Sequence, residues 1–181
     1  MSSDPYLDLA DDASLRMAIN ARSEERARQD RAADLATWVG TLRDLAERRV
    51  PVVVRTGHGR THRGVLAAIG VDHLAVRSVN GSLVLVAMDT VRLVRPDPSV
   101  VAPAAMGDRE VPHDRTIAEE LEFLVERAHV VAVVVRGLPD PLRGEVAGLG
   151  EDVLTLGGVG ADRGTIYLPL AAIAELMIDE R

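Results

Sequence analysis

One stretch of the chain recurs eighty residues later, and this repeat constrains the fold more than any other feature. Residues Arg63 to Leu74 read RGVLAAIGVDHL, and residues Arg143 to Leu154 read RGEVAGLGEDVL. Six of the twelve aligned positions are identical, and both glycines and the aspartate are among them. Self-similarity at a fixed spacing is typical of a duplicated structural unit. We therefore predict two copies of one small fold in tandem.

Each copy has the pattern of a small β structure. After Pro51, short aliphatic runs alternate with turn signals, and Asn80-Gly81 predicts a type I′ hairpin. The predicted strands of the first copy cover residues 52–54, 61–69, 73–79, 83–86 and 91–94. Five short strands within about 45 residues indicate a small barrel or a curled sheet. β character returns at Val130, so we expect a second unit of this kind after it.

Helices are expected before each unit. Residues 13–49 contain no proline and one glycine among strong helix formers, which predicts a long N-terminal helix. Thr116 and Glu119 have the spacing of a capping box, which predicts the start of a second helix. Four prolines make residues 96–113 a linker. The predicted organisation is a disordered N-terminus (1–12), an N-terminal helix (13–49), a first barrel (50–95), the linker (96–113), and a helix with a second barrel (114–181).

The repeated motif resembles that of a known family. Its pattern, x-G-x-(V/L)-x-x-(I/L)-G-x-D-x-L across the second and third strands, is similar to that of the Sm/LSm family of SH3-like barrels. Leu168 to Ile173, LPLAAI, resembles the bacterial form of the family's turn between the fourth and fifth strands. The resemblance covers residues 36–95 and 116–179. It implies an α+β, mostly β fold: a long N-terminal helix followed by two tandem five-stranded Sm-like/SH3-like barrels, each preceded by a helix.

The same resemblance implies a function. Members of the family assemble as rings and bind single-stranded RNA, so we expect RNA binding together with a homo-oligomer or an intramolecular pair of barrels. The family's base-contacting pattern, an Asp followed by a hydrophobic-Asn pair, is only half present. Asp72 and Asp152 are there, but the residues that follow them include no Asn, and the family's Arg-Gly motif is missing from both copies. The resemblance therefore implies the fold but not the base pocket.

The composition excludes several chemistries. The chain has no cysteine and no lysine, so all 21 basic residues are arginines. Disulfides, thiol nucleophiles, P-loops and Schiff-base lysines are therefore ruled out. His58 and His62 lack a third ligand at a fixed spacing, and no nucleophile–base pair is recognisable, so we expect no metal, no cofactor and no enzymatic activity. No signal peptide or membrane-spanning run is recognisable, which predicts a cytoplasmic protein without a membrane partner.

The net charge of −7 is unevenly distributed. Residues 50–95 carry six arginines against two aspartates, which gives +4, whereas residues 113–181 carry six arginines against thirteen acids, which gives −7. The densest basic cluster surrounds the first predicted hairpin and consists of Arg55, His58, Arg60, His62 and Arg63. Its guanidinium groups suit the phosphates of single-stranded RNA. Alternatively, the cluster is a solvated turn, or a surface that docks the acidic copy or a neighbouring subunit.

Two aspartates occupy the same place in the two copies. Asp72 and Asp152 follow glycine-containing turns before the third strand. We expect each carboxylate to accept hydrogen bonds from nearby backbone N–H groups, and the recurrence favours this structural role over catalysis.

A second candidate surface lies in the N-terminal helix. Residues 20–34 are charged nearly all round, and such a helix is either solvated or held by a partner. The candidate partner-binding residues are Arg22, Glu25, Arg26 and Arg28. The sequence thus supports two functions. The first is a non-catalytic RNA-binding protein of Sm-like type, and the second is a protein-interaction or assembly module that uses this helix and the barrel edges without nucleic acid.

Overall fold

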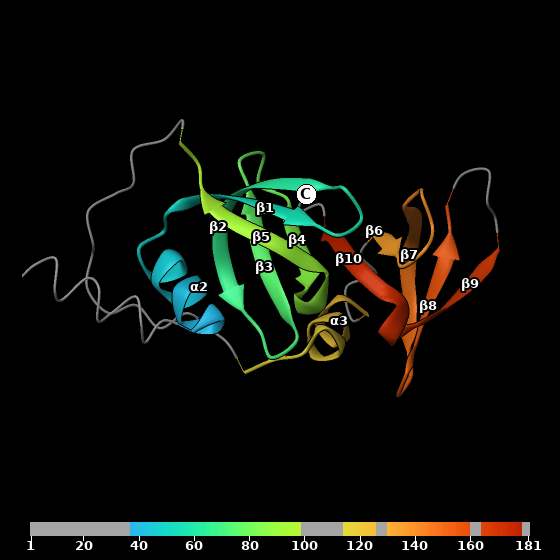
Figure 1. The fold of residues 1–181 in the computed structure, drawn as a ribbon. Coiled ribbons are helices and arrows are strands. Elements are labelled where there is room, and N and C mark those ends of the chain that lie inside the picture. The colour runs from blue at the N-terminus through green and yellow to red at the C-terminus, as the bar shows by residue number, and fades with distance from the viewer. Residues whose placement is uncertain (1–36, 99–113, 126–129, 160–163, 179–181) are drawn as a thin grey trace, which may run out of the picture. The chain divides into compact units, whose positions relative to one another are not determined.

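The computed structural model describes residues 37–98, 114–125, 130–159 and 164–178 of the chain (Figure 1). The first part contains α2 (Trp38–Glu47), β1 (Pro51–Thr56), β2 (Thr61–Ile69), β3 (His73–Ser78), β4 (Leu83–Ala87) and β5 (Val91–Pro96). The second part contains α3 (Ile117–Val125), β6 (Val130–Val135), β7 (Leu142–Leu149), β8 (Val153–Gly158), β9 (Thr165–Pro169) and β10 (Ile173–Ile178). Short 3-10 turns, Met88–Thr90 and Leu170–Ala172, precede β5 and β10. We call β1–β5 the first strand set and β6–β10 the second strand set.

All ten strands belong to one antiparallel sheet, in the order β5-β1-β2-β3-β4-β10-β6-β7-β8-β9. The predicted fold, a long N-terminal helix followed by two five-stranded barrels, is therefore wrong. The sheet is continuous because β4 pairs with β10, where Val86 lies opposite Glu175 and Leu83 opposite Ile178. Figure 1 shows β10, in red, beside β4. An isolated strand edge leaves backbone groups unpaired, and here each strand set satisfies one edge of the other.

The two strand sets have corresponding internal orders, β5-β1-β2-β3-β4 and β10-β6-β7-β8-β9. Each also has a register irregularity between its second and third strands. In the first set it lies between Leu66 and Ala68, and in the second between Val146 and Gly148, eighty residues further on. A register shift of this kind bends a strand and increases its twist. The β2 and β7 strands therefore bend at corresponding positions.

Helix α2 is much shorter than the predicted N-terminal helix, whose residues 13–36 lie outside the described residues. The helix begins after Thr37, because the Gly40 N–H donates to Thr37 Oγ1 at 3.0 Å and so satisfies one N–H of the first turn. It ends at Glu47, and the turn after it is closed by Arg49, which has a φ of 50° and whose N–H donates to the Ala46 carbonyl at 2.9 Å. A left-handed residue with such a backward hydrogen bond terminates a helix, and Pro51 follows within two residues.

The turn between β3 and β4 differs from the predicted type I′ hairpin. That turn type requires positive φ at both central residues. Gly81 has a φ of 91°, but Arg49 is the only non-glycine residue with positive φ in the described part of the chain, so Asn80 does not meet the requirement. Asn80 instead stabilises a wider loop, because its Oδ1 accepts from the N–H of Ser82 at 3.3 Å and from its hydroxyl at 3.0 Å.

The buried apolar side chains form two clusters. The first belongs to α2 and the first strand set and includes Leu42, Val52, Val54, Ile69 and Leu74. The second combines the second strand set with α3 and with residues of β3 and β4, and it includes Ala75, Leu85, Leu121, Leu154 and Leu176. Burial of such side chains contributes about 25 cal/mol per Å² of apolar surface removed from water. Because the second cluster crosses the β4–β10 junction, it stabilises the continuous sheet.

Candidate nucleic-acid interface

A groove of about 730 Å³ opens beside the predicted basic cluster. Its lining includes Arg55 from β1, Thr61, His62 and Arg63 from β2, Ser78 and Asn80 from the β3–β4 region, and Met177 from β10. Arg55 lies opposite Thr61 in the β1–β2 pair. Opposed residues share one face of a sheet, as do residues two apart on one strand. Arg55 and Arg63 therefore lie on the same face, and both are exposed.

A fully buried carboxylate lies close to this groove. Glu175 of β10 is 0% exposed, and its Oε1 accepts a hydrogen bond of 2.8 Å from the Thr56 hydroxyl. His62 Nε2 lies 2.9 Å from Oε2 of the same carboxylate. Arg60 Nε lies 3.1 Å from Oε2, which is an ion-pair distance, although the orientation of this nitrogen gives no hydrogen bond. A buried charge needs such partners, because leaving water is costly for an isolated ion.

The partners of Glu175 decide its protonation state. Burial by itself raises the pKa of this carboxyl, because the charged form loses its hydration. Hydrogen bonds from His62 and Thr56, together with the positive charges of His62 and Arg60, outweigh burial and hold the pKa of Glu175 below its usual value. The carboxylate is therefore ionised at neutral pH.

The predicted basic cluster separates into four environments. Arg55 and Arg63 are exposed on the groove. His62 lines the groove but is engaged by Glu175, and its side chain is 10% exposed. Arg60 points to β10, where it also places Nη2 3.6 Å from the Met177 sulfur. His58 is exposed in the β1–β2 turn and is not among the groove residues. The predicted partner-binding residues Arg22, Glu25, Arg26 and Arg28 lie outside the described residues.

Sequence reasoning missed Glu175, although a signal was present. This glutamate stands in the apolar strand Ile173–Ile178, sequence IAELMI. Glutamate is rarely fully buried unless it is paired, so an acid within an apolar strand indicates a buried partner. The identity of the partners was not readable, because Thr56 and His62 are 119 and 113 residues away in the chain.

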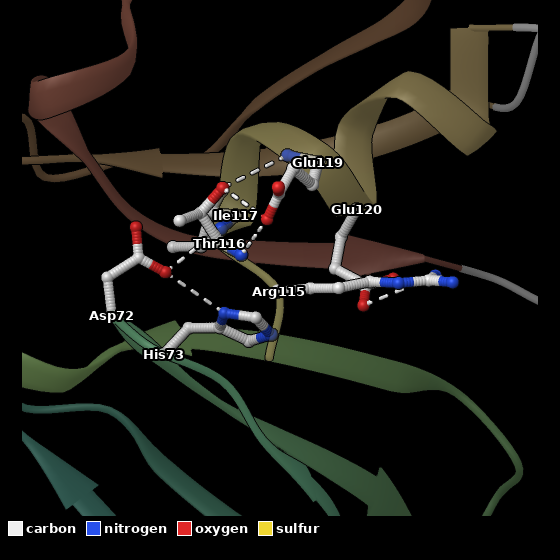
Figure 2. A network of polar contacts seen from close by, with 7 residues as sticks. All are labelled: Asp72, His73, Arg115, Thr116, Ile117, Glu119 and Glu120. Carbon is white, nitrogen blue, oxygen red and sulfur yellow. Dashed lines mark hydrogen bonds and ion pairs between the residues drawn. The ribbon is translucent and has the colours of Figure 1, made fainter. Parts of the chain in front are cut away.

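Asp72 has a role that differs from the expected one (Figure 2). Its Oδ1 accepts a hydrogen bond of 2.9 Å from the N–H of Ile117, the first residue of α3, which is 45 residues away and not in the same turn. The capping box at the start of α3 is confirmed: the Thr116 N–H donates to Glu119 Oε2 at 2.7 Å, and the Glu119 N–H donates to Thr116 Oγ1 at 3.3 Å. Asp72 therefore anchors the start of α3 to the β2–β3 turn.

Neither a metal site nor a membrane-spanning helix is found among the described residues. In the described ranges, no group of three or more His, Asp or Glu side chains is placed to hold a metal ion. Among the same residues, no helix has the length and apolar character needed to cross a bilayer. No protein-family model matches this chain, and a search of curated proteins finds no match.

Proposed function

We propose that the chain is a non-catalytic RNA-binding protein of Sm-like type, in which Arg55 and Arg63 supply the contacts to phosphate. The groove of about 730 Å³ that these two exposed arginines line carries the proposal. A guanidinium group presents several N–H donors in one plane, so it can donate two parallel hydrogen bonds to one phosphate. Two such groups on one face of neighbouring strands suit successive phosphates of an extended strand.

The groove suits the sugar-phosphate backbone better than the bases. Thr61, Ser78 and Ser82 bring hydroxyl groups and Asn80 an amide, while no Phe, Tyr or Trp is among its lining residues in the described part of the chain. Strand binding through the bases normally uses aromatic stacking. We therefore expect little sequence preference and a clear dependence on salt.

Fluorescence anisotropy of a labelled, mixed-sequence single-stranded RNA tests this proposal. Each phosphate contact contributes about 0.7 to the slope of log K against log salt for single strands, so two arginines contribute about 1.4. This contribution weakens binding about sevenfold between about 50 mM and about 200 mM salt. Binding with at least this salt dependence supports the proposal. Absence of binding at the lower salt concentration, where electrostatic attraction is strongest, overturns it.

A second candidate function is self-assembly without nucleic acid, and the two outer strands of the sheet favour it. β5 and β9 are the sheet edges, and they correspond to β10 and β4, which pair with each other at the junction of the strand sets. An exposed edge can accept another strand through its backbone groups. Pairing of β9 with β5 of a second copy would repeat the internal junction head to tail. Multi-angle light scattering tests this function, because a mass that stays monomeric as the protein concentration rises contradicts it.

A further inference from the structure

The β2–β3 turn of the first strand set is covered by the segment that leads into α3. The Ile117 N–H donates to Asp72 Oδ1 (Figure 2), and the Val71 N–H donates to the Arg115 carbonyl at 2.9 Å. The approach is close enough that a Cβ added to Gly70 would lie 2.6 Å from the Arg115 oxygen. This turn therefore acts as a docking site for the start of a helix.

The corresponding turn of the second strand set has the same backbone bonds. The Met88 N–H donates to the Asp72 carbonyl at 2.7 Å, and the Leu170 N–H donates to the Asp152 carbonyl at 2.8 Å. Likewise the Gly70 N–H donates to the His73 carbonyl at 2.9 Å, and the Gly150 N–H donates to the Val153 carbonyl at 2.8 Å. Asp152 is thus held where it matches Asp72.

The surroundings of the second turn are open. A groove of about 410 Å³ lies between it and α3, lined by Ala118, Glu122, Leu149, Gly150 and Glu151. Asp152 is exposed, and among the described residues no hydrogen-bond donor contacts its carboxylate. The second turn therefore offers the same groups that the start of α3 contacts on the first turn. In the described part of the chain, no helix start contacts them.

The start of helix α2 has the features that binding to the second turn would require. Trp38 is the first helical residue of α2 and follows Thr37, just as Ile117 is the first of α3 and follows Thr116. The first N–H groups of a helix have no partner within it, and Thr37 satisfies only that of Gly40. Trp38 and Val39 also leave apolar side chains 45% and 39% exposed.

We propose that the groove beside Glu151 and Asp152 receives the start of α2 from a second copy of this chain. In this contact the Asp152 carboxylate accepts a hydrogen bond from the Trp38 N–H of the other copy. The positive end of the α2 dipole favours the acidic turn. In the same contact, the basic first strand set of one copy would lie beside the acidic second strand set of the other. The inference rests on the assembly function proposed above. Pairing of β9 with β5 of a second copy would bring the α2 helix of that copy to this turn, just as β4–β10 pairing within one chain goes together with the contact of α3 with the first turn.

The single tryptophan of the chain reports on this contact directly. As protein concentration rises, we expect the emission of Trp38 to shift to shorter wavelength together with the rise in mass measured by light scattering. Asp152→Ala removes the acceptor and should raise the concentration needed for both changes about fivefold. Asp140→Ala removes an exposed acid from the β6–β7 turn of the same strand set and should leave both unchanged.

The outcomes separate the contact from the assembly. A rise in mass without a shift in Trp38 emission overturns the α2 contact while the strand-edge assembly stands. A mass that never rises overturns both. Because the chain has no cysteine, Thr37→Cys combined with Asp152→Cys gives a second readout that does not need the tryptophan signal. Oxidation should link two copies, and a pair that stays unlinked in the assembled protein contradicts the contact.

Discussion

His62 Nε2 lies 2.9 Å from the Glu175 carboxylate, across 113 residues of chain and between strands of the two strand sets. This contact ties β2 to β10 beside the β4–β10 junction. It also removes His62, and with it Arg60, from the set of cations that a ligand in the groove would meet. The stability of the junction and the choice of phosphate contacts therefore have a common origin in one buried carboxylate.

Replacing Glu175 should destabilise the fold. Glu175→Ala removes the acceptor of the Thr56 hydroxyl. It also removes the ion-pair partner of the buried Nε of Arg60. Breaking a buried ion pair costs about 3–5 kcal/mol, and we expect about 2–3 kcal/mol because the Arg60 side chain is 34% exposed and can be hydrated. Urea unfolding measures the change. Glu145→Ala, which removes an exposed acid from β7, should stay within about 0.5 kcal/mol. Equal midpoints for the two variants would contradict the role of Glu175.

The same carboxylate predicts a loss of stability in acid. Its pKa is lowered in the folded state, so between the folded and unfolded pKa values the unfolded state binds more protons. The stabilisation is complete above the usual value of 4.5 and is lost as pH falls through the folded value. Glu175→Gln cannot titrate. The difference in unfolding free energy between wild type and Glu175→Gln should therefore shrink as the pH falls below the usual carboxyl value of 4.5. A difference that is unchanged at pH 3 would rule out this linkage.

Gly64 should not tolerate a side chain. A Cβ at this position would overlap the carbonyl oxygen of Arg77 on the neighbouring strand β3, which cannot move without disturbing the ladder. Overpacking of this kind costs about 1–3 kcal/mol, so Gly64→Ala should lower the thermal midpoint by several degrees. Gly148→Ala is the control, since its Cβ would meet only the Thr155 Cβ at 4.0 Å. If both variants melt alike, close approach at Gly64 is not the constraint.

RNA binding should depend on Arg55 and Arg63 and not on basic charge in general. The double variant Arg55→Ala with Arg63→Ala should reduce the salt slope by about 1.4. Arg43→Ala with Arg48→Ala removes the same charge from two exposed positions outside the groove, one in α2 and one in the turn after it, and should keep the wild-type slope. Anisotropy titrations at several salt concentrations give both slopes. A charge reversal at Arg60 is unsuitable for this test, because it would place a second carboxylate beside Glu175. If the two double variants lose affinity equally, the groove is not the binding site.

Self-assembly should depend on Tyr167 of the β9 edge, which is 69% exposed. By the register of β4 with β10, where Leu85 lies opposite Leu176, Tyr167 would lie opposite Val94 of a second copy. Tyr167→Lys places a charge in that apolar contact and should raise the dissociation constant about tenfold or more. Tyr167→Phe keeps the ring and should assemble as wild type does. Sedimentation velocity distinguishes the two. An unaffected Tyr167→Lys variant would mean that β9 is not the edge used.

The local elements of the fold follow from residues that are close together in the sequence. The aliphatic runs after Pro51 became β1 to β5 near the predicted bounds, because alternation and turn residues act within a few positions. The capping box of Thr116 and Glu119 formed as predicted for the same reason. Asn80 already departs from its prediction, since several loop types satisfy an Asn-Gly pair and the flanking strands select among them.

The pairing of the two strand sets, and the cations that remain accessible to a ligand, depend on contacts between segments that are far apart in the sequence. No local pattern predicts that β4 pairs with β10 or that Asp72 anchors α3. Nor does any local pattern predict that Glu175 binds His62 and Arg60. Arg55 and Arg63 remain exposed on the groove. The contact of Asp72 with α3 joins residues 45 positions apart, and that of Glu175 with His62 joins residues 113 positions apart. Pairing of strand edges favours these arrangements, and the cost of burying Glu175 without partners disfavours the alternatives; both terms exist only once distant segments meet.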